Sequence, residues 1–280
     1  MKLSLAHTLR HYDKKNIGKD ILAGLIIMAV SIPISMGYAL IAGLPAVYGL
    51  YGSVFPILVF ALLSTSPQFI FGVDAAPAAL IGSALLTLHV EAGSEEAMAV
   101  VPVLTFFVAM WLLAFSFMKA GKLVNYISAP VMGGFITGIC STIILMQVPK
   151  ILGGTAGTGE FFELAKHIGQ TAKHVNMPSI LLGVASLVIL LVAKKLVPKF
   201  PMAVVLMVAG ACYTRVGNVR ELGIQTLSKV ETGLPQWQIP DFSAVSIREA
   251  VTVSLSVAVV IMAETLLAEN NFAQKNGYRI

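Results

Sequence analysis

Long stretches without a charged residue divide this 280-residue sequence. The longest run, between Asp20 and Asp74, has 53 residues. Further runs of 22, 27, 20 and 15 residues lie between Glu96 and Lys119, Lys122 and Lys150, Lys173 and Lys194, and Lys199 and Arg215. A helix needs about 20 apolar residues to cross a bilayer. The first run therefore holds two helices, which we expect to separate near 43–45.

We predict an all-α polytopic membrane protein with about eight transmembrane spans. A cytoplasmic N-terminal segment (1–19) should precede the transmembrane domain (20–268), and a cytoplasmic tail (269–280) should follow it. The first nineteen residues are polar and basic, and the apolar run after them is too long for a cleaved signal peptide. The expected spans are 20–40, 46–64, 74–90, 97–118, 123–148, 178–195, 200–214 and 246–268, of which the third and seventh are short.

The composition supports a membrane protein and excludes several other classes. Hydrophobic residues make up 57% of the chain and charged residues 12%, whereas soluble chains have about 25% charged residues. Disorder is excluded by this apolar content, and a disulfide-stapled secreted domain by the presence of only two cysteines. A net charge of +5 is too small to predict nucleic-acid binding.

The distribution of Lys and Arg predicts the orientation. With the N-terminus inside and eight spans, 12 of the 19 basic residues fall on the cytoplasmic side and 7 outside. This bias places both chain ends in the cytoplasm and predicts a multi-pass protein of the cell membrane.

Helix-breaking residues interrupt several of the spans. Pro33 and Pro56 lie inside the first two, and Gly133, Gly134 and Gly138 follow a proline in the fifth. Such residues are tolerated where the backbone lines a cavity or is covered by other helices. Packing kinks and contacts between small residues are the alternative explanation.

The third span has the clearest functional pattern. An uncharged, β-prone stretch (67–73) precedes Asp74, which is a good helix N-cap, and Pro77 suits a first helical turn. A helix that begins inside the membrane directs free N–H groups and a positive dipole end at an anion. Ala75 and Ala76 are small enough to let a ligand approach the backbone. The Asp74 carboxylate would compete with that anion unless it is protonated or turned away.

Two acids lie within apolar spans. Glu264 lies inside the eighth span, where a buried carboxylate is costly and suggests a functional role. Its alternative position is the cytoplasmic interface beside Glu269, if the helix ends early. Asp74 is explained equally well by an N-cap role.

Other kinds of site lack support in the sequence. The glycine-rich stretch 153–159 lacks the Lys-Ser/Thr ending of a P-loop and predicts a flexible external loop. His167 and His174 have no clear third ligand, so we expect no metal site. No catalytic constellation suggests an enzyme, and we expect no cofactor.

Several motifs, in order, resemble the sulfate permease (SulP) family of anion transporters, from about residue 17 to 280. The first region holds Asp20-Ile-Leu-Ala-Gly-Leu25, Ser31-Ile-Pro33, Tyr38-Ala39 and 42–51. The later ones are 122–138, 147–153, 233–235, Ile239-Pro240, Ala263-Glu-Thr265 and 272–278.

This resemblance implies a fold of two inverted seven-span repeats, of which the chain holds the first repeat and the eighth span. Six further spans and a cytoplasmic STAS domain would be missing. In the family, the short third and tenth spans hold the anion between a mobile core and a gate that dimerises. The resemblance thus implies a homodimer that carries a small inorganic anion, such as sulfate or bicarbonate.

The resemblance also implies the site residues. The anion site would use Ser35, Tyr38, Asp74, Ala75, Ala76 and Glu264, and Glu264, with Asp74, would couple transport to H⁺ or Na⁺. Anion exchange is a further mode. Two positions depart from the family: Ile34 stands where a glutamine is frequent, and Gly72-Val73 where Gly-Pro is common. A nucleobase transporter of the same fold and a non-transporting fragment are the alternatives.

Overall fold

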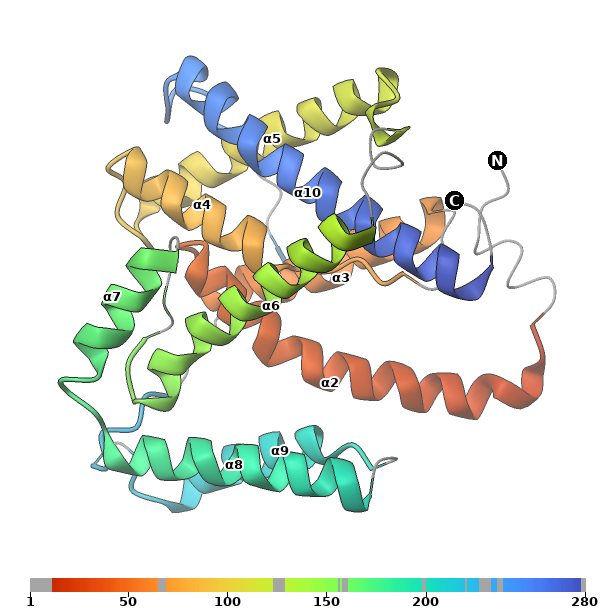
Figure 1. Ribbon diagram of the computed structural model, residues 1–280. Coiled ribbons are helices and arrows are strands. Elements are labelled where there is room, and N and C mark those ends of the chain that lie inside the picture. Colours follow the sequence, from red (N-terminus) through yellow and green to blue (C-terminus); the bar gives the residue numbers. More distant parts are fainter. Residues whose placement is uncertain are drawn as a thin grey trace. The chain divides into compact units, whose positions relative to one another are not determined.

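The computed structural model describes residues 12–64, 69–122, 129–155, 157, 161–197, 200–219, 221–226, 233–235 and 239–277. Across these residues the fold is all-helical, as predicted, and contains no strand. The expected features that fall on 1–11, 65–68, 123–128 and 278–280 lie outside the described residues. The elements are η1 (Lys14–Asn16), α2 (Ile17–Ile41), α3 (Ala46–Leu63), α4 (Ala75–Thr87), α5 (Glu95–Phe117), α6 (Ala129–Ile151), α7 (Phe161–Thr171), α8 (Met177–Leu196), α9 (Met202–Val216) and α10 (Ile247–Asn276) (Figure 1).

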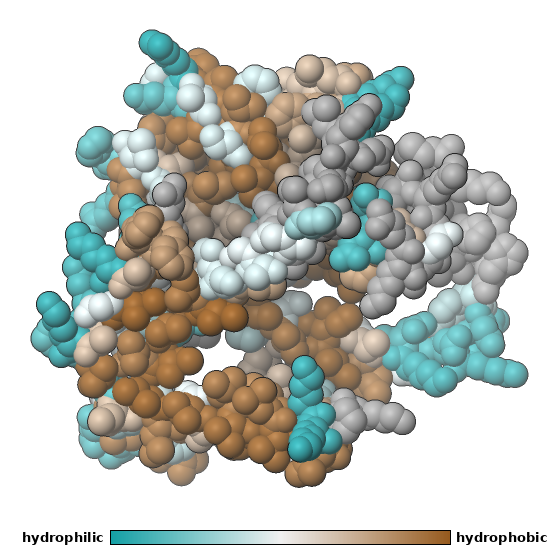
Figure 2. All heavy atoms as spheres, in the orientation of Figure 1, coloured by the Kyte–Doolittle hydropathy of each residue, from teal (hydrophilic) through white to brown (hydrophobic). Residues whose placement is uncertain are grey.

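Eight of these helices are apolar. In the described part of the chain five are long enough to cross a membrane: α2 with η1, α3, α5, α8 and α10. Three shorter apolar helices are α4, the second part of α6 (Cys140–Ile151) and α9. Large apolar side chains point outward, as Figure 2 shows on one face, and Leu181 on α8 is 72% exposed. Apolar surface of this extent needs lipid or protein against it.

Two elements differ from the expected spans. Helix α7 lies in a stretch where no element was predicted. It has eleven residues and is amphipathic, so it gives no long apolar run. Helix α10 continues to Asn276, beyond the expected end of the eighth span at 268. Glu264 therefore lies well inside a continuous helix, and the alternative of an early helix end is wrong.

The chain forms two compact units, which we describe separately. The first holds residues 1–14, 35–139 and 232–280, and the second holds 15–34 and 140–231.

In the first unit, α10 packs along α5 and also against α4, and buried residues of all three helices form one apolar cluster (Figure 1). Val100, Val103 and Leu104 of α5 are fully buried, with Leu85 of α4 and Ala250 of α10 in the same apolar cluster. Trp111 of α5 donates its indole N–H to the carbonyl of Val251 at 3.1 Å. Burial of this kind stabilises by about 25 cal/mol per Å² of apolar surface, so these contacts fix α4 and α10 on α5.

Two glycines let α3 and α4 pack directly on the backbone of α2. A Cβ at Gly49 would lie 2.0 Å from the carbonyl oxygen of Ser35, and one at Gly82 would lie 2.3 Å from that of Ile41. Real Cβ atoms do not approach this closely, so both positions require glycine. Small residues that allow backbones to approach are typical of membrane helix packing.

In the second unit, Asn176 connects three segments. Its side-chain oxygen accepts the N–H of Ser179 at 2.8 Å and caps α8, while its side-chain nitrogen donates to Leu222 O at 2.8 Å. Its backbone N–H donates to Leu152 O at 2.9 Å. The turn after α6, the start of α8 and the loop after α9 are thus joined at one residue.

Two described glycines of the stretch after α6 pack closely on neighbouring segments, and the flexibility expected of this loop stays a prediction. A Cβ at Gly153 would lie 2.5 Å from that of Asn176, and one at Gly157 would lie 2.6 Å from Leu164. Leu164 of α7 is fully buried as a result. The glycines here provide room for neighbouring side chains.

We predict that Gly82→Ala destabilises the first unit by about 1–3 kcal/mol, because the added methyl collides with backbone that cannot move alone. Thermal unfolding in detergent measures this change as a lowered Tm. Gly24→Ala is the matched control on α2, since no atom lies within 4 Å of its Cβ position. An unchanged Tm for Gly82→Ala would contradict the described contact.

We also predict that Asn176→Ala frays the start of α8. Loss of the cap costs about 1 kcal/mol, which corresponds to roughly fivefold faster hydrogen exchange of the first-turn amides, Ser179 among them. Asn176→Asp keeps the capping oxygen and loses only the donor to Leu222. Exchange at Ser179 should therefore stay slow in this second variant, and equal acceleration in both variants would argue against the cap.

Candidate functional site

The start of α4 is the local structure on which the site is built. Residues 69–74 are non-helical, and Asp74 has extended backbone angles (φ −122°, ψ 152°). Its carboxylate accepts the N–H of Ala75 at 2.6 Å, so Asp74 is the N-cap as predicted. The thirteen residues of α4 extend about 20 Å, less than the roughly 30 Å of a hydrocarbon core. This helix is too short to cross a membrane by itself.

Most of the N–H groups at this helix end are already used. Ala75 donates to Asp74, the nitrogen of Pro77 carries no hydrogen, and Ala78 donates to the backbone oxygen of Asp74 at 3.3 Å. The N–H of Ala76 has no recorded partner among the described residues. The end of α4 therefore offers one free backbone donor together with the positive end of the helix dipole.

Aromatic contacts hold the segment that leads into α4. The ring of Phe71 stacks on Phe60 of α3 with centroids 5.3 Å apart, and Phe69 meets the same ring edge-on at 5.7 Å. Phe69 also lies 6.5 Å from the ring of Phe272 on α10. Pairs with this geometry each add about 0.5–1.5 kcal/mol beyond area burial. They fix the direction in which Asp74 and the start of α4 point.

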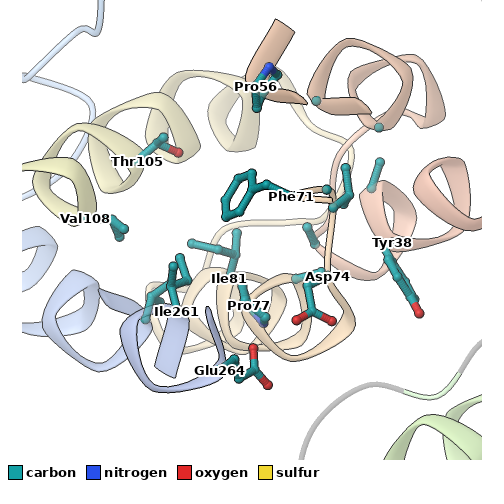
Figure 3. A pocket seen from close by; sticks show the side chains of 18 of the residues that line it. Tyr38, Pro56, Phe71, Asp74, Pro77, Ile81, Thr105, Val108, Ile261 and Glu264 are labelled. Carbon is teal, nitrogen blue, oxygen red and sulfur yellow. The ribbon is translucent and has the colours of Figure 1, made fainter. Parts of the chain in front are cut away.

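A pocket of about 560 Å³ lies within the first unit beside this helix end (Figure 3). Helices α2, α3, α4, α5 and α10 and the segment 69–74 all contribute to its wall. The wall is mainly apolar, with a few polar groups. These polar groups are the side chains of Tyr38, Tyr48, Asp74, Thr105, Glu264 and Thr265.

Asp74 and Glu264 bring two carboxylates to the same side of this pocket (Figure 3). Both carboxylate oxygens of Glu264 are shielded from solvent and have no hydrogen-bond partner among the described residues. Asp74 lies at the start of α4 and Glu264 on α10, so the two carboxylates come from different elements. Two carboxylates so close together are costly when both are ionised, and a proton or a cation between them removes that cost.

The predicted site residues divide into two groups. Tyr38, Asp74 and Glu264 line the pocket, although the Tyr38 hydroxyl points away from the two acids in Figure 3. Ser35 is 2% exposed, and neither it nor Ala75 lines the pocket. Ala76 contributes a free N–H but is not part of the wall.

Pro77 and Ala78, the next residues along α4, do line the pocket. Sequence reasoning also did not assign Thr105 and Thr265 to the site. Thr105 Oγ1 donates to Val101 O at 2.9 Å within α5, and its oxygen still has acceptor capacity. A threonine in an apolar helix gives no signal in one sequence. Thr265 directly follows Glu264, and this adjacency was the available clue.

Several known proteins are similar in sequence to this chain. The chain is 28% identical over 272 residues to a probable sulfate transporter of Mycobacterium tuberculosis. The alignment covers 97% of this chain and 48% of the relative. It is 27% identical to sulfate transporter 2.1 of Arabidopsis thaliana, with 97% and 42% covered. The chain thus spans about half the length of the curated relatives it matches.

Two solved structures share the fold. SLC26A9 superimposes with a TM-score of 0.81 at 24% identity, covering 99% of this chain and 47% of that one. The transmembrane domain of the cyanobacterial bicarbonate transporter BicA gives 0.75 at 19% identity, covering 95% and 68%.

The broadest match is to a family. The pattern of the sulfate permease family extends over residues 17–280, which include every α-helix described above. Together with the apolar helices, this match makes the chain a multi-pass membrane protein. The chain belongs to the sulfate permease family.

Proposed function

We propose that this protein takes part in secondary active transport of a small inorganic anion, such as sulfate or bicarbonate, across the cell membrane. One observation carries the proposal: the N-terminal end of a short helix and a shielded, unpartnered carboxylate from another helix line one pocket. Relatives named as sulfate transporters and a bicarbonate transporter of the same fold support the substrate class.

The anion would bind at the start of α4. The helix dipole supplies about half a positive charge there, and the N–H of Ala76 supplies a direct hydrogen bond. Ala76 is partly exposed, whereas Ala75 is buried and its N–H is used by Asp74. Asp74 opposes the anion while it is charged, so anion binding and neutralisation of Asp74 should occur together.

Glu264 would carry the coupling ion, with Asp74 as its partner. A charged carboxylate without partners is unfavourable in an apolar surrounding, and either H⁺ or Na⁺ would neutralise it. The anion, which is attracted by the helix end, would then meet less repulsion from the two acids. Coupled uptake follows if the cation and the anion favour each other's binding. Anion exchange would instead proceed without a net movement of this cation.

We further propose a cytoplasmic N-terminus, a membrane domain beginning near residue 20, and a homodimer as the working assembly. The excess of Lys and Arg on one side supports the orientation. The outward-facing apolar residues of α8 leave surface for lipid or a second copy.

We predict that Glu264→Gln abolishes ion-driven accumulation of the anion, with a loss of roughly tenfold or more, because the amide cannot bind H⁺ or Na⁺ as a carboxylate does. Proteoliposomes containing purified protein measure this as uptake of radiolabelled sulfate and bicarbonate, with inward H⁺ or Na⁺ gradients imposed separately. Uracil serves as a comparison substrate, since its uptake in place of anions would favour a nucleobase transporter.

Glu249→Gln is the matched control for this experiment. Glu249 lies on the same helix, is exposed, and does not line the pocket. Uptake by this variant should equal that of the unmodified protein. Full ion-driven uptake by Glu264→Gln would remove Glu264 from the coupling mechanism.

We predict that Asp74→Asn strengthens anion binding while leaving α4 intact. Asparagine is as good an N-cap as aspartate, but it carries no charge to repel the anion. The gain should be about fivefold or more in apparent Kd, because like charges about 4 Å apart repel by about 1 kcal/mol even at the dielectric constant of water. Sulfate-dependent thermal stabilisation measures this gain. Asp74→Ala should instead lower the Tm, because the cap is lost. Weaker binding in Asp74→Asn would show that the acid assists the anion.

A further inference from the structure

A second pocket, of about 490 Å³, lies at the C-terminal end of α5, also within the first unit. It is bounded by α5, by the turn that follows α5, and by α10. Its wall is mainly apolar, with two hydroxyl side chains, Ser116 and Thr265, and two lysines. The apolar residues used below are Leu112, Phe115, Ile261 and Leu266, and the lysines are Lys119 and Lys122.

The turn after α5 places both lysines beside α10. The helix ends at Phe117, and Lys119 adopts a left-handed conformation (φ 54°), which reverses the chain. The N–H of Lys122 then donates to Lys119 O at 3.1 Å. Gly121 lies between them against Leu266, and a Cβ at this glycine would be 3.6 Å from a methyl of that leucine. Both lysines therefore line the pocket.

The charge of the pocket wall is unbalanced. No acidic residue lines the pocket, and among the described residues neither lysine has a recorded ion pair. Both lysines are exposed. An anionic group could thus bind Lys119 and Lys122 without displacing an existing acidic partner.

The same end of α5 has the features of a membrane surface. Phe117 is 85% exposed and Met118 76% exposed, directly beside the lysines. Large apolar side chains next to cations fit the boundary between acyl chains and headgroups. On the orientation proposed above this boundary is the cytoplasmic leaflet, which carries anionic lipid.

We propose that this pocket binds an anionic phospholipid, with an acyl chain against Leu112, Phe115, Ile261 and Leu266 and the headgroup phosphate on Lys119 and Lys122. The pocket adjoins the one described above. Phe71, Ile261 and Thr265 line both. A bound lipid would therefore contact the wall shared by the two pockets, which includes Phe71 in the segment that leads to Asp74. The binding itself does not depend on transport activity.

Trp111 provides a reporter for this site. Its ring stacks on Phe115, with centroids 6.1 Å apart, and the sequence has only one other tryptophan, Trp237. In a Trp237→Phe background, the experiment is quenching of Trp111 by phospholipids with brominated acyl chains in reconstituted vesicles. Brominated phosphatidylglycerol is compared with brominated phosphatidylcholine.

We expect phosphatidylglycerol to be preferred roughly tenfold or more at low salt, since each lysine near a membrane surface contributes about 1 kcal/mol toward anionic lipid. In the double variant with Lys119→Gln and Lys122→Gln, the two lipids should quench about equally. The matched control is Lys194→Gln with Lys195→Gln, a pair of exposed lysines in the last turn of α8 that lines neither pocket. This control should keep the full preference.

Three results would overturn the proposal. Equal quenching by both lipids in the unmodified protein would show that acyl chains fill the pocket but that the headgroup is not recognised. An absence of quenching by either lipid would show that another part of the protein covers the pocket. A preference that survives loss of Lys119 and Lys122 would place the anionic contact elsewhere. Gel filtration of each variant checks that it is folded.

Discussion

A helix that starts inside an apolar body must satisfy its own first N–H groups, and the structure around Asp74 follows from this constraint. Each amide left unpaired in an apolar surrounding costs free energy. Asp74 and Pro77 between them leave one donor free, on Ala76. The rest of the first unit keeps α4 in place: Gly82 lets it lie on the backbone of α2, and Leu85 buries it against α5.

The acid pair gives this capped end its chemical interest. Asp74 has two roles that conflict when an anion is present, because it caps the helix as a hydrogen-bond acceptor and repels the anion as a charge. Glu264 approaches from α10 with both oxygens shielded and unpartnered. Asp74 alone is explained by its N-cap role, whereas Glu264 has no structural partner among the described residues. Their meeting in one pocket is the feature on which the proposed coupling of anion binding to cation binding depends.

Much of the helical layout could be predicted because membrane spans exclude charge. The N-cap at Asp74 was also predictable, since an acidic residue, small residues and a proline mark a helix start. Helix α7 was missed because eleven amphipathic residues resemble a polar loop. The contacts of Gly153 and Gly157 depend on side chains outside the glycine-rich stretch, so the local pattern could not predict them. For the same reason the sequence did not assign Thr105 to the pocket, or exclude Ser35 from its wall.

Pro77 has a consequence for selectivity. Many helix ends direct several backbone N–H groups at an anion. At the start of α4, Pro77 has no N–H and the N–H of Ala75 is already bonded to Asp74. An ion held here must keep part of its hydration shell, because a single amide cannot replace the water molecules it would give up. Discrimination among oxyanions at this position should then depend on charge and radius more than on a directional pattern of donors.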